Sequence, residues 1–153
     1  MKIALLILLS ISSLLANAQS QEQRKANFNT NEQNVVNDGY DPVSYFIAGP
    51  LMGKEENAYT YKGVIYWFAN NASKNTFMKN PQKFEPQYGG WCAYALGLEP
   101  QKVKVDPKTY KIVDSKLYLF YNFGFTNTLK SWNKDENGLL PKADENWKVL
   151  VKE

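Results

Sequence analysis

The sequence contains no histidine and only one cysteine, Cys92. Without histidine, no Ser-His-Asp triad or Cys-His pair can form, and no imidazole can bind zinc, copper or haem. With a single cysteine, the chain cannot form an intrachain disulfide. The fold must therefore depend on its hydrophobic core, and a composition of 44% hydrophobic and 14% aromatic residues is rich enough to build one.

The sequence also lacks a large excess of charge of either sign. The formal net charge is +3, and no cluster of lysine or arginine marks a phosphate-binding face. Aspartate and glutamate are scattered, and no pair of them stands in an apolar setting suited to general acid–base catalysis. We therefore predict a protein that is not an enzyme and does not bind nucleic acid.

The N-terminus has the pattern of a bacterial signal peptide over residues 1–18. Lys2 supplies the positive charge, an apolar stretch runs from Ile3 to Leu15, and Ala16-Asn17-Ala18 resembles a cleavage site. The apolar stretch is shorter than the roughly 20 residues of a transmembrane helix, and the alternative is an uncleaved anchor. The pattern predicts export to the periplasm or the extracellular space, with no stable membrane insertion after cleavage.

The rest of the chain reads as a flexible polar leader over 19–37 and a single domain over 38–150 that ends in a hairpin and a helical extension. β-Branched and aromatic residues predict one hairpin of 58–61 and 64–68, and a second of 110–113 and 116–121. Capping and proline signals predict helices over 41–48, 71–79 with Phe77 and Met78 buried, 92–96, 126–134, and 141–149 with Trp147 facing inward.

The predicted fold class is α+β, with two β-hairpins joined in one antiparallel sheet and short helices packed on it. Strands and helices do not alternate along the chain, which disfavours a parallel nucleotide-binding sheet. The small residues of the 92–96 helix allow close approach, so we expect it to lie against a hairpin.

Three groups of residues resemble the YHS domain family. They are Asp41-Pro42-Val43-Ser44-Tyr45-Phe46, the run Tyr59-x-Tyr61-x-Gly63-x-x-Tyr66-Trp67-Phe68, and Phe77-x-x-x-Pro81-x-x-Phe84. Segments at 86–94, 112–119 and 142–147 further resemble the exported, stand-alone branch of that family. The resemblance implies a small treble-clef or TRASH-like domain, from a metal-binding group often found with heavy-metal transporters.

The resemblance also implies where a metal would bind. In metal-associated members of the family, cysteines occupy the positions that are Ser44, Ala69 and Ser73 in this chain. None of these residues carries sulfur, and neutral hydroxyls suit Cu(I) or Zn(II) poorly. We therefore predict no resident metal or other cofactor, and metal binding has only the family analogy behind it.

The candidate ligand-binding residues come from the aromatic frame of the matching segments and the single cysteine: Trp67, Trp91, Cys92, Tyr94 and Tyr45. Alternation along 66–68 predicts that Tyr66 and Phe68 point inward and Trp67 points to solvent or to a partner. The alternative is that the aromatic residues only form the core and that Cys92 is a small buried residue. Asp41 suits a helix cap better than a ligand.

These observations predict an exported, non-enzymatic, YHS-like module that binds an unknown small molecule or protein partner near Trp67, Trp91 and Cys92. One alternative is a periplasmic protein that handles copper or zinc through Cys92, with Met52, Met78 or backbone oxygens as further ligands. The other alternative is a purely structural or interaction module, which predicts buried aromatic residues, a buried Cys92 and no pocket.

Overall fold

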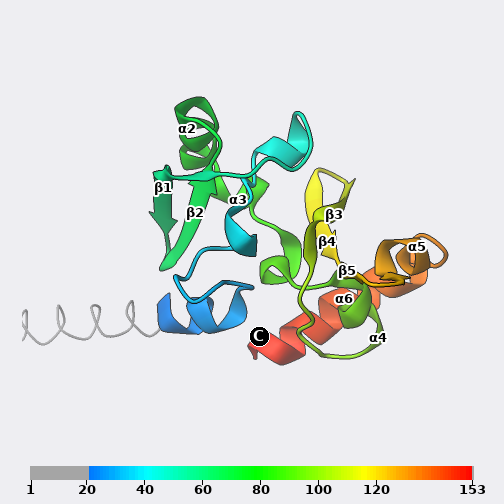
Figure 1. Cartoon of the computed structure of the whole chain (residues 1–153). Coiled ribbons are helices and arrows are strands. Elements are labelled where there is room, and N and C mark those ends of the chain that lie inside the picture. The colour runs from blue at the N-terminus through cyan, green and yellow to red at the C-terminus, as the bar shows by residue number, and fades with distance from the viewer. Residues whose placement is uncertain (1–20, 153) are drawn as a thin grey trace, which may run out of the picture.

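The structure, a computed structural model, describes residues 21–152 and is shown in Figure 1. The predicted signal peptide at 1–18 lies outside the described residues. The described chain begins with helical turns at 21–27. Its helices, strands and 3-10 turns (labelled η) then follow in the order η1 (Asn37–Gly39), η2 (Ser44–Phe46), β1 (Lys54–Tyr61), β2 (Val64–Phe68), α2 (Asn71–Lys79), α3 (Pro81–Phe84), η3 (Gln87–Gly90), α4 (Ala93–Leu98), β3 (Asp106–Val113), β4 (Lys116–Phe120), β5 (Asn122–Phe123), β6 (Thr126–Asn127), α5 (Thr128–Trp132) and α6 (Glu136–Val151).

Both predicted hairpins are confirmed, and each closes through a two-residue turn. In the β1–β2 hairpin φ is 48° at Lys62 and 88° at Gly63, and in the β3–β4 hairpin it is 49° at Asp114 and 60° at Ser115. Positive φ at both central residues is the type I′ geometry, whose twist matches the twist of the flanking strands. The turns thus set the strand register locally, which is why residue types near them were sufficient to predict the hairpins.

The two hairpins do not join, so the prediction of a single antiparallel sheet was wrong. Within residues 21–152, β1–β2, β3–β4 and β5–β6 each form a separate two-stranded antiparallel sheet. Other segments pair with the hairpins instead, because Val35 bridges to Ile65 of β2 and Cys92 bridges to Leu119 of β4. These segments cover the edges at which the hairpins could have met. The coarser α+β class is confirmed, since helices and antiparallel strands are both present.

The expectation of a flexible leader over 19–37 was wrong for residues 21–37, which are tied to the rest of the chain. Val35 and Val36 are buried, and the Val36 amide donates a hydrogen bond of 2.9 Å to the carbonyl of Ile65. The Asn29 amide donates to the carbonyl of Gly89 at 2.8 Å. The burial of these valines and the backbone hydrogen bonds therefore outweigh the conformational entropy that is lost when a mostly polar segment becomes ordered.

The predicted helices are present with changed lengths and faces. Of the two asparagines that could cap α2, Asn70 and Asn71, the cap is Asn70, which accepts a hydrogen bond from the Ser73 amide at 2.9 Å. Phe77 of α2 is buried, whereas Met78 is 46% exposed, so the prediction that both face the core was wrong. The helix predicted over 41–48 is reduced to the short turn η2.

The C-terminal helix is longer than predicted. We placed Pro141 near its start, but α6 begins five residues earlier, and Pro141 lies inside it. Asp135 caps this start by accepting a hydrogen bond from the Gly138 amide at 3.2 Å. The extra residues bury Leu139, which adds to the burial of Ala143 further along α6 and compensates for the hydrogen bond that a proline nitrogen cannot donate.

The core lies in three clusters of buried side chains, one around each hairpin and one between them. In the cluster around β1 and β2, the Phe77 ring lies 4.7 Å from that of Tyr66 and 5.2 Å from that of Phe68. Both partners point inward from β2, as the alternation predicted.

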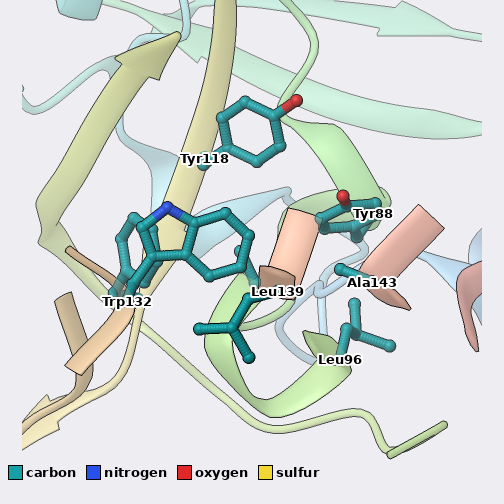
Figure 2. Close-up of a cluster of buried hydrophobic side chains, with 8 residues drawn as sticks. Tyr88, Leu96, Tyr118, Trp132, Leu139 and Ala143 are labelled. Atoms are coloured by element: carbon teal, nitrogen blue, oxygen red, sulfur yellow. The ribbon is translucent and has the colours of Figure 1, made fainter. Parts of the chain in front are cut away.

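The second cluster joins α4 and α6 to β4, and Figure 2 shows part of it. Leu139 and Ala143 of α6 face Leu96 of α4, and Trp132 and Tyr118 cover them from the β4 side. A Cβ atom on Gly97 would lie 2.9 Å from Leu139, so glycine permits this close helix contact. Contrary to prediction, the helix after Cys92 therefore packs mainly on α6.

Replacing Leu139 by alanine tests this helix contact. The Leu139→Ala variant should lose about 2–5 kcal/mol of unfolding free energy in denaturant titration, because it leaves a cavity between α4 and α6. Leu98→Ala is the matched control, since Leu98 is 61% exposed at the end of α4. Equal losses in the two variants would contradict the assignment of Leu139 to the core.

Candidate functional site

The carboxylate of Asp41 is only 1% exposed and ties three segments together. Its Oδ1 accepts hydrogen bonds from the amides of Val43 at 2.9 Å and Ser44 at 3.4 Å. Its Oδ2 accepts from the Ala69 amide at 3.0 Å and from the Ser73 hydroxyl at 2.5 Å. Asp41 thus caps the turn before η2, as predicted, and also fastens it to the end of β2 and the start of α2.

The three positions that correspond to family metal cysteines meet at this carboxylate. Ser44, Ala69 and Ser73 all donate to Asp41 through an amide or a hydroxyl. The Ser44 hydroxyl in turn donates to the Asp41 carbonyl at 2.7 Å and accepts from the Leu51 amide at 3.0 Å. No group of three or more Cys, Asp or Glu side chains placed to hold a metal ion occurs within residues 21–152. Ser44, Ala69 and Ser73 do not fit as ligands of a soft metal, because they carry no sulfur and their N–H and O–H groups donate hydrogen bonds to the Asp41 carboxylate.

Changing Asp41 to asparagine tests this arrangement. In either orientation of the asparagine side chain, its NH₂ group would face a backbone N–H that donates to Asp41 in the parent. A hydrogen bond to a charged oxygen would thus be replaced by two donors that face each other. Asp41→Asn should lower the free energy of unfolding by about 2 kcal/mol or more in denaturant titration. Asp38→Asn, at an exposed neighbour, should stay within about 0.5 kcal/mol of the parent. A parent-like Asp41→Asn would show that the network contributes little.

Cys92 is a core residue with no exposed surface. It contacts the buried residues Leu117 and Leu119 of β4, and its Sγ accepts a hydrogen bond of 3.3 Å from the Tyr121 amide. Met52 and Met78, the partners considered for a sulfur-based copper site, are both exposed. The surroundings of Cys92 are therefore those of a small buried core residue, and its thiol is not exposed at the surface.

The other four candidate residues do not form one face. Tyr45 is buried and donates its hydroxyl to the Pro107 carbonyl at 2.7 Å, and burial, with Tyr40 and Asp106 nearby, raises its pKa. Trp67 is half-buried, and its ring covers Gly39, where a Cβ atom would lie 2.6 Å from the indole. Tyr94 is half-buried between two of the core clusters. Trp91 donates its indole N–H to the Asn27 carbonyl at 2.8 Å, beneath the cleft described next.

A cleft of about 580 Å³ lies where the helical turns at 21–27, the segment from α3 to η3 and the end of α6 meet. In Figure 1 the blue N-terminal turns and the red end of α6 lie next to each other at this place. Its volume is within the range of about 300–1,000 Å³ typical of small-molecule sites. The lining residues are Gln23, Arg24, Asn27, Phe28, Gln82, Glu85, Pro86, Gln87, Tyr88, Gly89, Trp147, Val151 and Lys152.

An ion pair forms one wall of the cleft. The guanidinium of Arg24 pairs with the carboxylate of Glu85, which also accepts a hydrogen bond of 2.5 Å from the Tyr66 hydroxyl. The guanidinium carbon lies 4.2 Å from the centre of the Phe28 ring, a cation–π arrangement. Burial, and then the charge of Glu85, raise the pKa of Tyr66. The charge of Arg24 is therefore neutralised within the wall.

The opposite wall is aromatic. Tyr88 has a φ of 56°, which turns its side chain toward α6, where its hydroxyl donates to Asp144 at 2.8 Å. The rings of Tyr88 and Trp147 lie 6.2 Å apart. Burial, and then the hydrogen bond to Asp144, raise the pKa of the Tyr88 phenol. Trp147 packs against the core cluster, as the predicted inward orientation requires, but it is only half-buried and also lines the cleft.

Lys102 binds the turns at 21–27, which form the N-terminal part of the cleft lining. Its ammonium donates to the Ala26 carbonyl at 2.9 Å and to the Asn27 Oδ1 at 3.0 Å. Burial lowers the pKa of this ammonium. Together with the bond from Trp91 to Asn27, these contacts hold the turns at 21–27 in place although they carry few apolar side chains.

Sequence reasoning missed this cleft. Arg24 and Glu85 stand 61 residues apart in the chain, and nothing local to either marks the pair. Phe28 was the one signal in the polar leader, since an isolated aromatic residue there needs a partner. Trp91, alone among the five candidate residues, is hydrogen-bonded to a cleft-lining residue within the described part of the chain.

The raised pKa values of the buried tyrosines lead us to expect that the protein loses stability and unfolds at alkaline pH. Burial, and then the carboxylates of Asp144, Asp114 and Glu136, raise the pKa of Tyr118 to about 12, and those of Tyr66 and Tyr88 are raised as well. Since an unfolded tyrosine has a pKa of about 10, their contribution to stability is complete below that pH and is lost as the pH rises through the folded values.

Absorbance at 295 nm followed alongside circular dichroism measures this effect. The part of the phenolate signal that belongs to the buried tyrosines should appear only above about pH 11, together with the loss of circular dichroism. The control is protein in denaturant, whose tyrosines should ionise in one step near about pH 10. A native sample that ionises completely in that step while keeping its fold would contradict the packing.

Comparisons of this chain with protein-family models, with curated proteins and with solved structures find no match. Among the described residues, no helix has the length and apolar character needed to span a membrane.

Proposed function

We propose that this protein is a non-enzymatic binding module that takes a small polar molecule in the cleft between the turns at 21–27 and the end of α6. The single observation that carries the proposal is the cleft itself, which is large enough for a small molecule and has walls held by specific contacts. A preformed concave site with a few converging polar groups is the usual form of a ligand site.

The state of the charged groups in the cleft favours binding over catalysis. Glu85 is occupied by Arg24 and by Tyr66, and the Tyr88 hydroxyl is committed to Asp144. An acid–base catalyst needs a group that can exchange protons with a substrate in reach of it. These groups are instead engaged with one another, so they fit a role in shaping the walls.

The proposal keeps the family setting predicted from the sequence, an exported domain of the YHS type with a treble-clef-like arrangement. The meeting of Ser44, Ala69 and Ser73 at Asp41 supports it, because the resemblance requires these three positions to be neighbours. The proposed module is metal-free at that place. The buried thiol of Cys92 likewise speaks against a role in handling copper or zinc.

Ligand-detected NMR with a library of small polar compounds, followed by amide chemical-shift mapping, tests the proposal. Compounds that bind should shift the amides of residues 23–28, 82–89 and 147–152. The Gln82→Trp variant should bind these compounds about tenfold or more weakly, because the larger indole occupies part of the cleft. Gln82 is exposed, so the fold should tolerate the substitution. Gln101→Trp is the matched control, since Gln101 is exposed and lies outside the cleft.

Two results would overturn the proposal. One is a library in which no compound shifts the cleft amides, which would leave the structural or interaction module as the better interpretation. The other is native mass spectrometry of protein from the exported fraction that shows stoichiometric copper or zinc, which would end the metal-free version.

A further inference from the structure

We infer that the ligand of the cleft is a neutral, polyhydroxylated molecule of the sugar type. The inference rests on the proposed function and adds to it the chemical class of the ligand. It depends on three properties of the lining residues, namely their amide groups, their cancelled charges and their aromatic surface.

Primary amides dominate the polar part of the lining. Gln23 and Asn27 come from the turns at 21–27, Gln82 and Gln87 come from the stretch 82–89, and all four border the same cleft. A carboxamide both donates and accepts hydrogen bonds, as a hydroxyl group does. Lys102 donates to the side-chain oxygen Oδ1 of Asn27, and the two N–H donors of that side-chain amide are left for other partners. Several such groups around one space match a ligand with many hydroxyls better than they match an apolar one.

The charges of the cleft argue against an ionic ligand. The charges of Arg24 and Glu85 neutralise each other, and the Glu85 carboxylate also accepts a hydrogen bond from the Tyr66 hydroxyl. Lys152, the remaining lining residue with a formal charge, is exposed at the last turn of α6. A charged ligand would have to leave water without meeting an uncompensated charge inside the cleft, which carries a large desolvation cost. A neutral ligand avoids this cost.

The aromatic wall supplies a surface for a sugar ring. Trp147 is half-buried and is supported from behind by Tyr88, whose position is fixed by the hydrogen bond to Asp144. The face of an indole carries a partial negative charge, and the C–H bonds of a pyranose face carry partial positive charge, so the two attract. A rigid aromatic platform beside several amides thus offers contacts to both faces of one ligand, apolar and polar.

Titrations with sugars that differ in charge test the inference. The neutral probes D-glucose and N-acetyl-D-glucosamine have D-glucose 6-phosphate and D-glucosamine as their charged counterparts, and cellobiose is a further neutral probe. Each is added to the ¹⁵N-labelled full chain, and binding is followed by amide shifts and by the indole N–H signal of Trp147, which the Trp147→Phe variant assigns. At least one neutral probe should shift the cleft amides and bind about tenfold or more tightly than its charged counterpart.

Variants connect the binding to the amides. Gln82→Ala and Gln87→Ala should each weaken the neutral probe about three- to tenfold, the loss expected for one hydrogen bond, while Gln101→Ala should leave it unchanged. Trp147→Phe should retain more binding than Trp147→Leu, because phenylalanine keeps an aromatic face. Circular dichroism of each variant establishes that the fold is retained.

The outcomes separate this inference from the proposed function. If the charged counterparts bind more tightly, or if no neutral probe shifts the cleft amides at millimolar concentration, the ligand class is wrong. If compounds of the polar library still bind in the cleft in that case, the proposed function stands without it. If neither sugars nor library compounds bind there, both are wrong.

Discussion

The burial of the Asp41 carboxylate is the constraint from which the N-terminal half of the structure follows. A charged group can be placed in a protein interior only if its oxygens are supplied with hydrogen-bond donors. The donors come from the turn before η2, from the end of β2 and from the first turn of α2. These segments can therefore move only together, and the cluster around Phe77 is packed against a frame that is already fixed.

The same physical solution recurs at the cleft. Within the described residues, some contacts between distant parts of the chain are made by single, partly buried polar groups that have more than one partner. Glu85 accepts from Arg24 and Tyr66, and Lys102 donates to two groups of the N-terminal turns. A chain with one cysteine has no disulfide to close such contacts, and charge-assisted hydrogen bonds serve in its place.

What the sequence allowed us to predict was local. The hairpins follow from two-residue turns between β-forming residues, and the start of α2 follows from Asn70 as a cap. The edges at which the hairpins end could not be predicted, because they depend on segments such as Val35 and Cys92 that bridge to them from elsewhere. The start of α6 was missed for a similar reason, since the burial of Leu139 against α4 outweighs the proline signal five residues into the helix.

The candidate site shows the same limit. Tryptophan and cysteine were chosen because their chemistry is conspicuous, yet Cys92 is buried and Trp67 covers a turn. Apart from its aromatic wall, the cleft is lined by glutamine, asparagine and an ion pair, residue types that are ordinary on a protein surface and acquire a role only through their placement. Such placement depends on long-range contacts, and one sequence contains no direct record of them.

The cleft takes its walls from segments that lie near opposite ends of the described chain, at 23–28 and at 147–152. The hairpins close over a few residues and can form early in folding, whereas these walls meet only after nearly the whole chain has been ordered. During synthesis the cleft is therefore completed late, and a nascent chain that lacks the end of α6 already contains the hairpins of the described residues but lacks one wall of the cleft.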